Sequence, residues 1–350
     1  MQSSKAKLLT VAVPAYNAEW CLEKCLSSFV TSPASDSLEV IVVNDGSTDN
    51  TRAIALKNAE KYPQVIKLLD KENGGHGSTI NAAIRQATGK YFKVVDADDW
   101  IITENLARFV DILSNTEADA IITHFHTVDM QSGERRKYKT RGIPLNEQYT
   151  IDGFTSYSGE IFQCAALHGL TYRTDVYRDS KTEITEGIFY VDQEYATLPF
   201  TKVRTMLPLD MFFYEYLVGN VSQSVSDSNL AKRLNQVEQV MFRLFRCLAD
   251  NPSLPVGAYR YIARKATDML KYYYIAALVK NPDKPDGLKG AARVRQEIKE
   301  TQPILAKKAD LQYNIAVLMN KLGFTGRTLD IMKHPLPYML YRKLFKRNRK

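Results

Sequence analysis

Three aspartates follow an apolar run in the stretch YFKVVDADDW, residues 91–100, where Asp96, Asp98 and Asp99 come directly after strand-forming residues. Carboxylates this close repel one another unless a cation joins them, or unless they form only an acidic turn that caps the next helix. Carboxylate oxygens are the ligands that Mg²⁺ and Mn²⁺ prefer, and such an ion can carry a phosphorylated ligand. We therefore expect a divalent cation at Asp98, with Asp96 as the candidate second ligand.

Similar polar clusters follow three other apolar runs, and together they predict an α/β fold. These apolar runs lack the polar–apolar alternation of a half-exposed strand, and segments with a helical pattern separate them. The first helical segment has Asn17 as its expected N-cap. The expected strands are 8–14, 38–45, 65–70, 91–99 and 119–124, and the expected helices are 17–30, 49–61, 78–87 and 103–114. This alternation predicts a mostly parallel, Rossmann-like sheet covered by helices on both faces. The polar clusters then meet at the carboxyl ends of the strands, where ligands bind in such folds.

A nucleoside diphosphate fits what these loops offer. Asp45 in VVNDGSTD can accept a hydrogen bond from a uracil ring N–H, and the backbone of residues 14–17 can pack along the base. Tyr16 adds an aromatic face. Each feature also has a simpler interpretation, because a lone DxD is common, Asp45-Gly46 can be only a turn, and Asn17 can be only a cap.

Taken together, four motifs resemble those of the family-2 glycosyltransferases, inverting enzymes of the GT-A fold, here of the bacterial cell-envelope or polysaccharide type. The motifs are VAVPAYN, VIVVNDGSTDNT, ENGGHGSTINAAI and KVVDADDW, and the resemblance extends over about residues 8–220. It implies that Asp45 reads uracil, Asp96 contacts the ribose, and Asp98 binds Mn²⁺ or Mg²⁺. The donor pocket that it implies comprises Pro14, Ala15, Tyr16, Asn17, Asp45, Asn73, Gly75, Asn81, Asp96 and Ala97.

The chain departs from the family pattern at Ile80. Many relatives carry an arginine just before the asparagine that matches Asn81, so a cation near the phosphates is missing here. The loop from His76 to Ser78, or a later basic residue, would have to replace it.

The resemblance also indicates a general base in GIFYVDQEYATLP, residues 187–199. Asp192 falls on the matching position, Val191 replaces the acid that usually precedes it, and Glu194 is the alternative base. The simpler interpretation is a carboxylate that complements a helix dipole. His168 and Tyr172 are candidates for the acceptor cleft, although a core position is the plainer interpretation for the histidine.

The second half of the chain changes character. Mixed hairpin and strand signals, with a helix expected near 190–199 and strands at 203–208 and 211–218, give way to helices after residues 219–229. The expected domains are therefore 1–225 (GT-A), 226–332 (helical) and 333–350 (basic tail). Three apolar stripes with a 3.5-residue period predict helices that pack within the chain, with a homodimer interface as the alternative. The stripes are Leu230, Leu234, Val237, Met241, Leu244 and Leu248; Ile262, Ala266, Met269 and Tyr273; and Leu311, Ile315, Leu318 and Leu322.

The charge balance excludes a general nucleic-acid surface. The net charge is +8, but residues 333–350 hold seven Lys or Arg and no acid, and the rest has 40 basic against 39 acidic residues. No nucleic-acid motif accompanies the tail, so no nucleic-acid partner is expected. The tail has the composition of a basic amphipathic helix that can lie on an anionic membrane, or else it is a solvated terminus.

The expected location is cytoplasmic, with membrane association on the inner face through the tail. No signal pattern is visible, and the apolar patch at 269–279 is too short to span a bilayer. The cysteines at 21, 25, 164 and 247 are expected to be reduced.

These patterns predict a metal-dependent inverting glycosyltransferase that moves one sugar from a UDP-sugar to a glycan, lipid-linked or protein acceptor. The QxxRW sequence and transmembrane helices of processive relatives are missing, and SQSVS (222–226) stands there as a candidate lid. The alternative is a nucleotide-sugar-binding protein of this fold without turnover, which Ile80 and Val191 would suit. A nucleotidyltransferase would need a Gly-rich basic loop that VPAYNAEW does not provide.

Overall fold

The computed structural model describes residues 6–157, 160–219 and 232–325. The chain divides into two compact units. One unit contains the sheet and also residues 250–263, and the other contains the remaining described helices after residue 232. The predicted domain boundaries at residues 225 and 332, the candidate lid at 222–226 and the basic tail at 333–350 lie outside the described residues.

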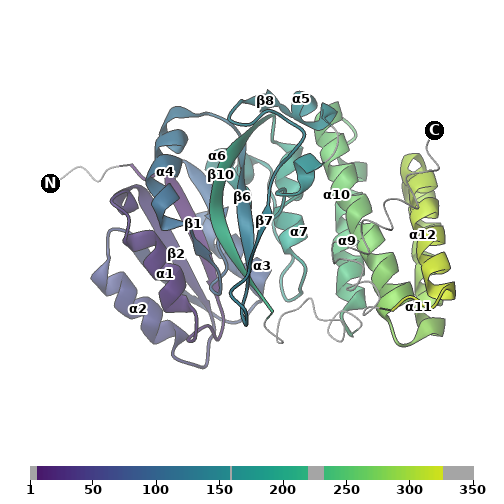
Figure 1. Ribbon diagram of the computed structural model, residues 1–350, viewed down its shortest axis with the longest axis horizontal. Coiled ribbons are helices and arrows are strands. Elements are labelled where there is room, and N and C mark those ends of the chain that lie inside the picture. Colours follow the sequence, from purple (N-terminus) through teal and green to yellow (C-terminus); the bar gives the residue numbers. More distant parts are fainter. Residues whose placement is uncertain (1–5, 158–159, 220–231, 326–350) are drawn as a thin grey trace. The chain divides into compact units, whose positions relative to one another are not determined.

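The first unit is built on one mixed sheet (Figure 1), in which the described strands run in the order β3-β2-β1-β4-β9-β6-β10-β5. β1 pairs parallel with β2 and β4, and β2 pairs parallel with β3. β9 enters antiparallel between β4 and β6, and β7 extends β6 as a hairpin. The strands are β1 Leu9–Ala15, β2 Leu38–Asp45, β3 Ile66–Lys71, β4 Tyr91–Val94, β5 Trp100–Ile101, β6 Ala120–Asp129, β7 Arg135–Tyr138, β8 Tyr149–Thr150, β9 Leu170–Arg173 and β10 Thr205–Val218.

Helices cover both faces of the parallel part, as the buried strands require. Every residue of β1 and β2 is buried, which fits their Val- and Ile-rich sequences. Right-handed crossovers place α1 and α2 on one face, and they place α3 on the other because the chain turns back from β3 to β4. The helices of this unit are α1 Leu22–Val30, α2 Thr51–Lys61, α3 His76–Gln86, α4 Leu106–Asn115, α5 Ile151–Ser156, α6 Thr174–Asp179 and α7 Asp192–Tyr195. The predicted fold class is confirmed.

Some local predictions were wrong. Asn17 is not an N-cap, because α1 begins five residues later at Leu22, and Asn17 instead adopts a φ of +49° in the preceding loop. The helix expected near 190–199 is a single turn, α7, followed by a 3₁₀ turn that contains Pro199. The two strand pieces expected at 203–208 and 211–218 form one strand, β10.

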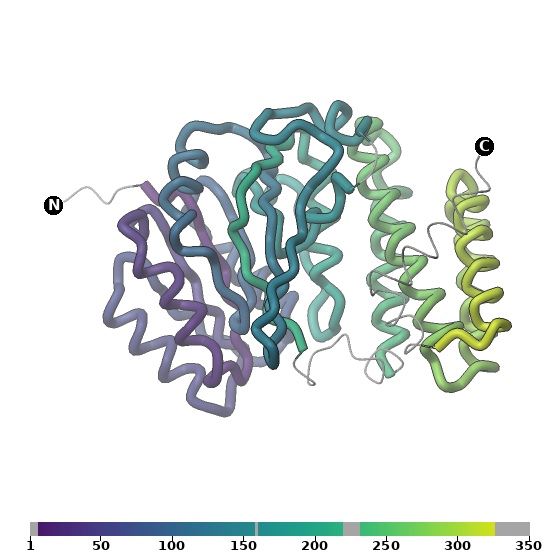
Figure 2. Tube along the Cα trace, viewed as in Figure 1, coloured from purple at the N-terminus to yellow at the C-terminus, as the bar shows by residue number. Residues whose placement is uncertain are grey.

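The later helices are α9 Leu234–Asp250, α10 Val256–Ile275 with a π turn at Ala276–Lys280, α11 Lys284–Thr301 and α12 Ala306–Lys321. Figure 2 follows the chain from the sheet, in purple to teal, into these helices, in green to yellow. In the first stripe Leu234 is half-buried and Val237, Met241, Leu244 and Leu248 are buried, and all four residues of the second stripe, on α10, are buried. No helix that the structure describes is both long and apolar enough to cross a membrane.

The third stripe does not pack as expected. Leu311, Ile315, Leu318 and Leu322 on and after α12 are between 48% and 66% exposed, so the prediction of packing within the chain is wrong for this stripe. The helix buries Ala309 and Ala316 instead, because these small side chains allow a close approach to its neighbours. The alternative use of such a stripe, in a homodimer, stays a prediction. The cysteines are free thiols, as expected.

Candidate active site

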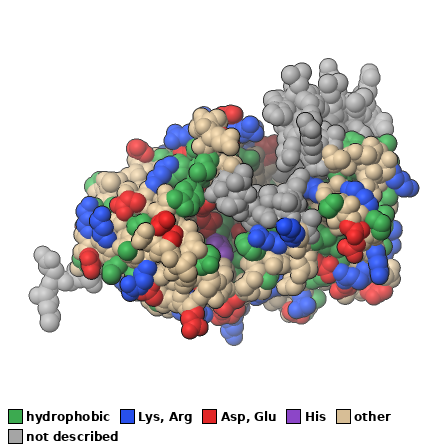
Figure 3. Space-filling view, turned by 90° about the horizontal axis from the view of Figure 1, so that it is seen from below, with side chains coloured by type: hydrophobic (Ala, Val, Ile, Leu, Met, Phe, Trp, Pro, Cys, Tyr) green, Lys and Arg blue, Asp and Glu red, His purple; other side chains and the backbone are tan. Residues whose placement is uncertain are grey.

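The carboxyl ends of β1, β2 and β4 meet at one edge of the sheet, because β1 lies between the other two and is parallel to both. This edge receives Tyr16 and Asp96 from the loops after β1 and β4, and Asp45 from the last position of β2. Figure 3 views the molecule from below and shows a hollow in which acidic side chains and a histidine gather. The sequence-based prediction that the polar clusters share one edge is therefore confirmed.

Asp45 is buried and shapes the loop after β3. Its Oδ1 accepts hydrogen bonds from Lys71 Nζ at 2.7 Å and from Gly74 N at 3.0 Å. Its Oδ2 accepts one from Gly75 N at 2.8 Å. Gly75 has a φ of +82°, a conformation that glycine adopts without a steric penalty, and it precedes the first residue of α3. The structure thus brings Asp45 together with Asn73 and Gly75, while its contact with uracil stays a prediction.

The loop after β1 is fastened to the loop after β2. Asn17 N donates to Ser47 Oγ at 3.1 Å, and Thr48 N donates to Asn17 Oδ1 at 2.9 Å. These bonds explain how Asn17 holds its unusual φ. Pro14 and Ala15 are buried beneath the edge, whereas the Tyr16 side chain is 54% exposed and presents an aromatic face to solvent.

The three aspartates of DADD have different environments. Asp99 is fully buried and accepts hydrogen bonds from Tyr214 Oη at 2.5 Å and from Leu217 N at 2.7 Å. Burial and the charges of Asp98 and Asp96 raise the pKa of Asp99 well above its ordinary value. Asp99 therefore attaches the motif to β10 and is not available as a ligand.

Asp96 pairs with a histidine. His76 Nε2, at the first turn of α3, lies 2.8 Å from Asp96 Oδ1. Burial alone would raise the pKa of Asp96, but the neighbouring His76 outweighs it and the pKa is lowered. The pKa of His76 is raised, because the charge of Asp96 and the hydrogen bond to it overcome the effect of burial. Asp96 N also donates to Tyr214 Oη at 3.2 Å.

Asp98 has the least compensated charge of the three. Burial, with the charge of Asp96 next to it, raises the pKa of Asp98 to about 6. Its carboxylate receives no hydrogen bond from another residue among those described, so a cation would relieve an unfavourable charge. In the described residues no group of three His, Cys, Asp or Glu side chains is placed to hold a metal. A metal here would need further oxygen ligands, which Mg²⁺ and Mn²⁺ commonly take from phosphates and water.

Asp192 and Glu194 lie on α7 but differ in environment. Asp192 is the first residue of the helix, and its Oδ2 accepts a hydrogen bond from Gln193 Nε2 at 2.7 Å. Its charge helps to raise the pKa of both His76 and Tyr216, as the charges of Asp96 and Asp98 also do. Asp192 therefore belongs to the same site as the DADD motif.

Glu194 is fully buried beside the segment 184–187. Its Oε2 and Oε1 accept hydrogen bonds from Thr185 N and Thr185 Oγ1, both at 2.8 Å. Asn81 on α3 holds the same segment, since Asn81 Nδ2 donates to Ile184 O at 2.9 Å and Ile184 N donates to Asn81 Oδ1 at 2.8 Å. Asn81 Nδ2 also donates to Glu186 Oε1 at 3.0 Å. The predicted contact of Asn81 with the donor stays a prediction.

Ile80 is fully buried on α3, so the position of the missing arginine faces the core. Tyr172 is fully buried too, and its Oη donates to Tyr195 O at 2.9 Å, so its assignment to an acceptor cleft was wrong. His168 stacks on Tyr216 with ring centroids 4.0 Å apart, and burial lowers its pKa to about 4.

Sequence reasoning missed two tyrosines of this site, Tyr214 and Tyr216. Both lie on β10, more than a hundred residues after the DADD motif. Tyr214 donates a hydrogen bond to Asp99, and the charges of the motif help to raise the pKa of Tyr216. The alternation in FFYEYLV was the available signal, because residues two apart on a strand share a face. Nothing local indicated that this face meets Asp99.

The family assignment rests on comparison with known proteins. The model of Glycosyl transferase family 2 matches residues 10–171. An uncharacterized glycosyltransferase of Escherichia coli (strain K12), YibD, is 46% identical over 263 residues, which cover 71% of this chain and 74% of that protein. The chain belongs to glycosyl transferase family 2. The predicted resemblance to this family is confirmed.

Solved structures show the same fold at low identity. The crystal structure of S. aureus TarS 1-349 in complex with UDP-GlcNAc superposes with a TM-score of 0.51 at 19% identity, covering 91% of this chain and 92% of that one. The mannosyltransferase PcManGT from Pyrobaculum calidifontis, in complex with GDP-Man and Mn²⁺, gives a TM-score of 0.53 at 18% identity and covers 89% and 84%. The chain spans little more than half of two other glycosyltransferases that it matches, 54% and 60% of their lengths.

Proposed function

We propose that this protein transfers a single sugar from a UDP-sugar to a glycan, lipid-linked or protein acceptor, with inversion and with the help of a divalent metal. The observation that carries the proposal is that the charges of Asp96, Asp98 and Asp192 act on the same two groups, His76 and Tyr216. This observation supports one site in which a nucleotide-side carboxylate pair would act together with a candidate base from a helix distant in the sequence.

The donor would bind across the loops after β1, β2 and β3. Tyr16 is exposed and suited to stack on a base, and Asp45 lies among the backbone amides of the 73–75 loop. Two structural relatives support a nucleotide-sugar donor, since TarS was solved with UDP-GlcNAc and PcManGT with GDP-Man. The choice of uracil over guanine rests on Asp45 and stays part of the proposal.

Asp98 would hold the metal, with Asp96 as a second ligand or as the contact to the ribose. The unrelieved charge at Asp98 and its hard oxygen ligands suit Mn²⁺ or Mg²⁺. A divalent cation bound there would stabilise the charge that develops on the departing diphosphate, an effect worth several kcal/mol. PcManGT, a protein of this fold, was solved with Mn²⁺.

His76 is the candidate for the cation that the buried Ile80 does not supply. It begins α3, where backbone N–H groups also favour an anion, and the acids around it raise its pKa. The protonated ring can hold Asp96 in place and add positive charge beside the phosphates.

Asp192 would be the general base that takes the proton from the acceptor hydroxyl as the oxygen attacks the anomeric carbon. It begins α7 and lies within the electrostatic reach of the site. Glu194 is less suited, because Thr185 donates to both of its oxygens and the side chain is fully buried.

Calorimetric titration with UDP, with and without Mn²⁺, tests the donor site. The wild type should bind UDP much more tightly with Mn²⁺, and Asp98→Ala should lose this difference. Asp175→Ala is the matched control, since it removes an exposed carboxylate at the opposite end of the sheet. Tight binding that does not depend on the metal would reject DADD as the metal site, and no binding to UDP would reject the donor assignment.

The binding protein without turnover is separated from the enzyme by a second variant. Asp192→Asn should keep UDP binding and lose turnover if the protein is an enzyme. If the wild type shows neither transfer nor hydrolysis of any UDP-sugar while it binds UDP normally, the alternative function holds.

A further inference from the structure

A cavity of about 560 Å³ opens on the sheet unit between α1, β5, β6, β7 and β10. It shares no residue with the donor pocket, the metal motif or the candidate base. β6 and β7 form one hairpin, and the other three elements come from separate regions of the sequence. Each of the five supplies one side chain that can bind a ligand: Lys24, Trp100, His126, Arg135 and Glu215. Convergence of this kind defines a built pocket whose size is typical of small-ligand sites.

Glu215 places a carboxylate at this cavity, although it is only 2% exposed. Its Oε1 pairs with His126 Nδ1 at 3.1 Å. Its Oε2 is buried and receives no hydrogen bond from the residues that the structure describes, and Arg135 Nε lies 3.5 Å away. Buried acceptors normally have a donor, so this oxygen is under-satisfied without a ligand. The Arg135 side chain is 60% exposed and can turn to meet one.

Aromatic rings form the walls of the cavity. The His126 ring stacks on Phe212 with centroids 4.1 Å apart and planes 2° apart. Trp100 lines the pocket, and Lys24 Nζ lies 3.0 Å from the centroid of its ring. Flat aromatic faces with polar groups around them suit a sugar ring, which has apolar faces and hydroxyl groups at its edge.

Cations outnumber anions around this pocket. Arg135, Lys137 and Lys139 alternate along β7 and just past its end, so they lie on one face. Lys137 Nζ and Lys139 Nζ lie 6.0 and 5.1 Å from the centroid of the Phe212 ring.

The acids nearby do not match all of these cations. Arg135 faces Glu215, and Lys139 Nζ lies 3.9 Å from Asp210, which also pairs with His124. Neither Lys24 nor Lys137 has a carboxylate within ion-pair distance in the part of the chain that the structure describes. Glu104 also lines the cavity and is the remaining acid there. A ligand with a negative group would therefore be favoured.

We propose that this cavity binds an anionic sugar unit of the acceptor, a sugar phosphate or a uronate. The proposal rests on the function proposed above, because the ligand of this cavity is an acceptor only if the protein transfers a sugar. Trp100 lies two residues after Asp98, so their Cα atoms are at most about 7 Å apart. An acceptor glycan held here by one charged unit can present another unit at the reaction centre.

Calorimetric titration of the full chain with three disaccharides tests the proposal. The probes are trehalose 6-phosphate, digalacturonate and uncharged trehalose. A charged probe should bind, and trehalose should bind at least about tenfold more weakly, because hydrogen bonds to charged groups are the stronger ones. Lys24→Gln and Arg135→Gln should each weaken the charged probe by about tenfold. Arg136→Gln is the matched control, since Arg136 lies on the other face of β7 and is 64% exposed; it should change nothing.

Binding of only trehalose 6-phosphate, or of only digalacturonate, supports the proposal and identifies the acid group. Equal binding of trehalose and both acids overturns the proposal. It is also overturned if none of the three probes binds at concentrations up to about 10 mM, since a dissociation constant of that size corresponds to a binding free energy of only about 3 kcal/mol. Unchanged binding in both cavity variants, with their melting temperatures preserved, also overturns it. UDP titration of the same proteins separates the two proposals. If the protein binds a sugar acid but not UDP, the cavity proposal stands and the proposed donor site is rejected. If it binds UDP but no sugar acid, the donor site stands and the cavity proposal is rejected.

Discussion

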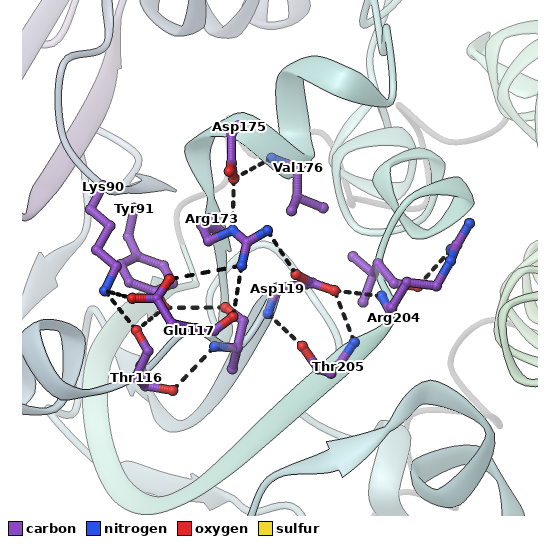
Figure 4. A network of polar contacts seen from close by, with 12 residues as sticks. Lys90, Tyr91, Thr116, Glu117, Asp119, Arg173, Asp175, Val176, Arg204 and Thr205 are labelled. Carbon is purple, nitrogen blue, oxygen red and sulfur yellow. Dashed lines mark hydrogen bonds and ion pairs between the residues drawn. The ribbon is translucent and has the colours of Figure 1, made fainter.

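The two ends of the sheet use acidic side chains in different ways. At the amino ends of β4, β6 and β10, Glu117, Asp119 and Asp175 are matched by cations (Figure 4). Arg173 reaches Asp175 at 2.7 Å and Asp119 at 3.3 Å, and Lys90 reaches Glu117 at 2.6 Å. The second oxygen of Asp119 accepts hydrogen bonds from the backbone N–H groups of residues 204 and 205.

At the carboxyl ends, the charges of Asp96, Asp98 and Asp192 all act on His76, and the pKa of Asp98 is raised to about 6. The matched charges at one end join loops and strands, whereas burial and the neighbouring Asp96 disfavour the charge of Asp98 at the other end. The difference teaches which charges serve stability and which are kept for a ligand.

The same contrast appears within β4 and the residue before it. Lys90 pairs with Glu117 at the edge, whereas Lys93, three residues later, is fully buried. Lys93 Nζ donates to His168 O at 2.8 Å and to Leu170 O at 3.1 Å, and no carboxylate among the described residues pairs with it. Burial therefore lowers the pKa of Lys93 to about 7.

The largest effect expected is on turnover. Asp192→Asn should lower kcat by about 10²- to 10⁴-fold, because it removes the proposed base, while UDP affinity and melting temperature stay within error. Asp175→Asn, at the matched end, should leave kcat unchanged. Full activity in Asp192→Asn would show that another residue is the base. The carboxyl end of the sheet would then differ from the amino end in its charges but not in a catalytic role for Asp192.

The next effect is a pH dependence of stability. The pKa of Lys93 is about 7 in the folded chain, against an ordinary value of 10.5, so in this window the unfolded state binds the additional proton. Raising the pH from 7 to 9.5 should therefore stabilise the wild type relative to Lys93→Met by up to about 3 kcal/mol. Urea unfolding at several pH values measures this difference. Lys90→Met is the control, and parallel curves for wild type and Lys93→Met would contradict the assignment.

A smaller loss of stability is expected from the matched network. Arg173→Met leaves Asp119 and Asp175 without their cation and should lower the free energy of unfolding by about 2 kcal/mol, less than for a fully buried pair because Arg173 is partly exposed. UDP binding should be unaffected. Arg136→Met, which removes an exposed pair with Glu134, should cost no more than about 0.5 kcal/mol. If both variants lose the same free energy of unfolding, the network of Figure 4 stabilises the protein no more than an exposed ion pair does.

The smallest effect has the opposite sign. Without metal at pH 7.5, Asp98→Asn should raise the free energy of unfolding by about 1 kcal/mol, because it removes a charge that burial and Asp96 disfavour. The same variant should lose metal-dependent UDP binding. Asp99→Asn should be destabilised instead, since Asp99 accepts from Tyr214 and Leu217. A lower free energy of unfolding in Asp98→Asn would show that repulsion between Asp98 and Asp96 does not destabilise the folded protein.

Sequence patterns predicted the half of the sheet whose contacts are local. Each parallel strand is followed by a helix and a polar loop, so the order of elements alone places Asp45 and Asp96 at one edge. The environment of each acid could not be predicted, because it depends on residues distant in the chain. Asp99 differs from Asp98 only through Tyr214 and Leu217 on β10. Glu194 differs from Asp192 through Thr185, which no spacing rule connects to α7.

The segment 184–187 has a consequence for how the site would work. Asn81 and Glu194 hold it by side-chain hydrogen bonds, Gly187 N donates to Gly74 O, and a Cβ at Gly77 would collide with Thr185 O. The helix that begins next to the nucleotide loop is therefore joined to the turn that carries Asp192. If these two elements bind the donor and the acceptor as proposed, little reorganisation would be needed at the moment of reaction, because the fold already fixes their separation.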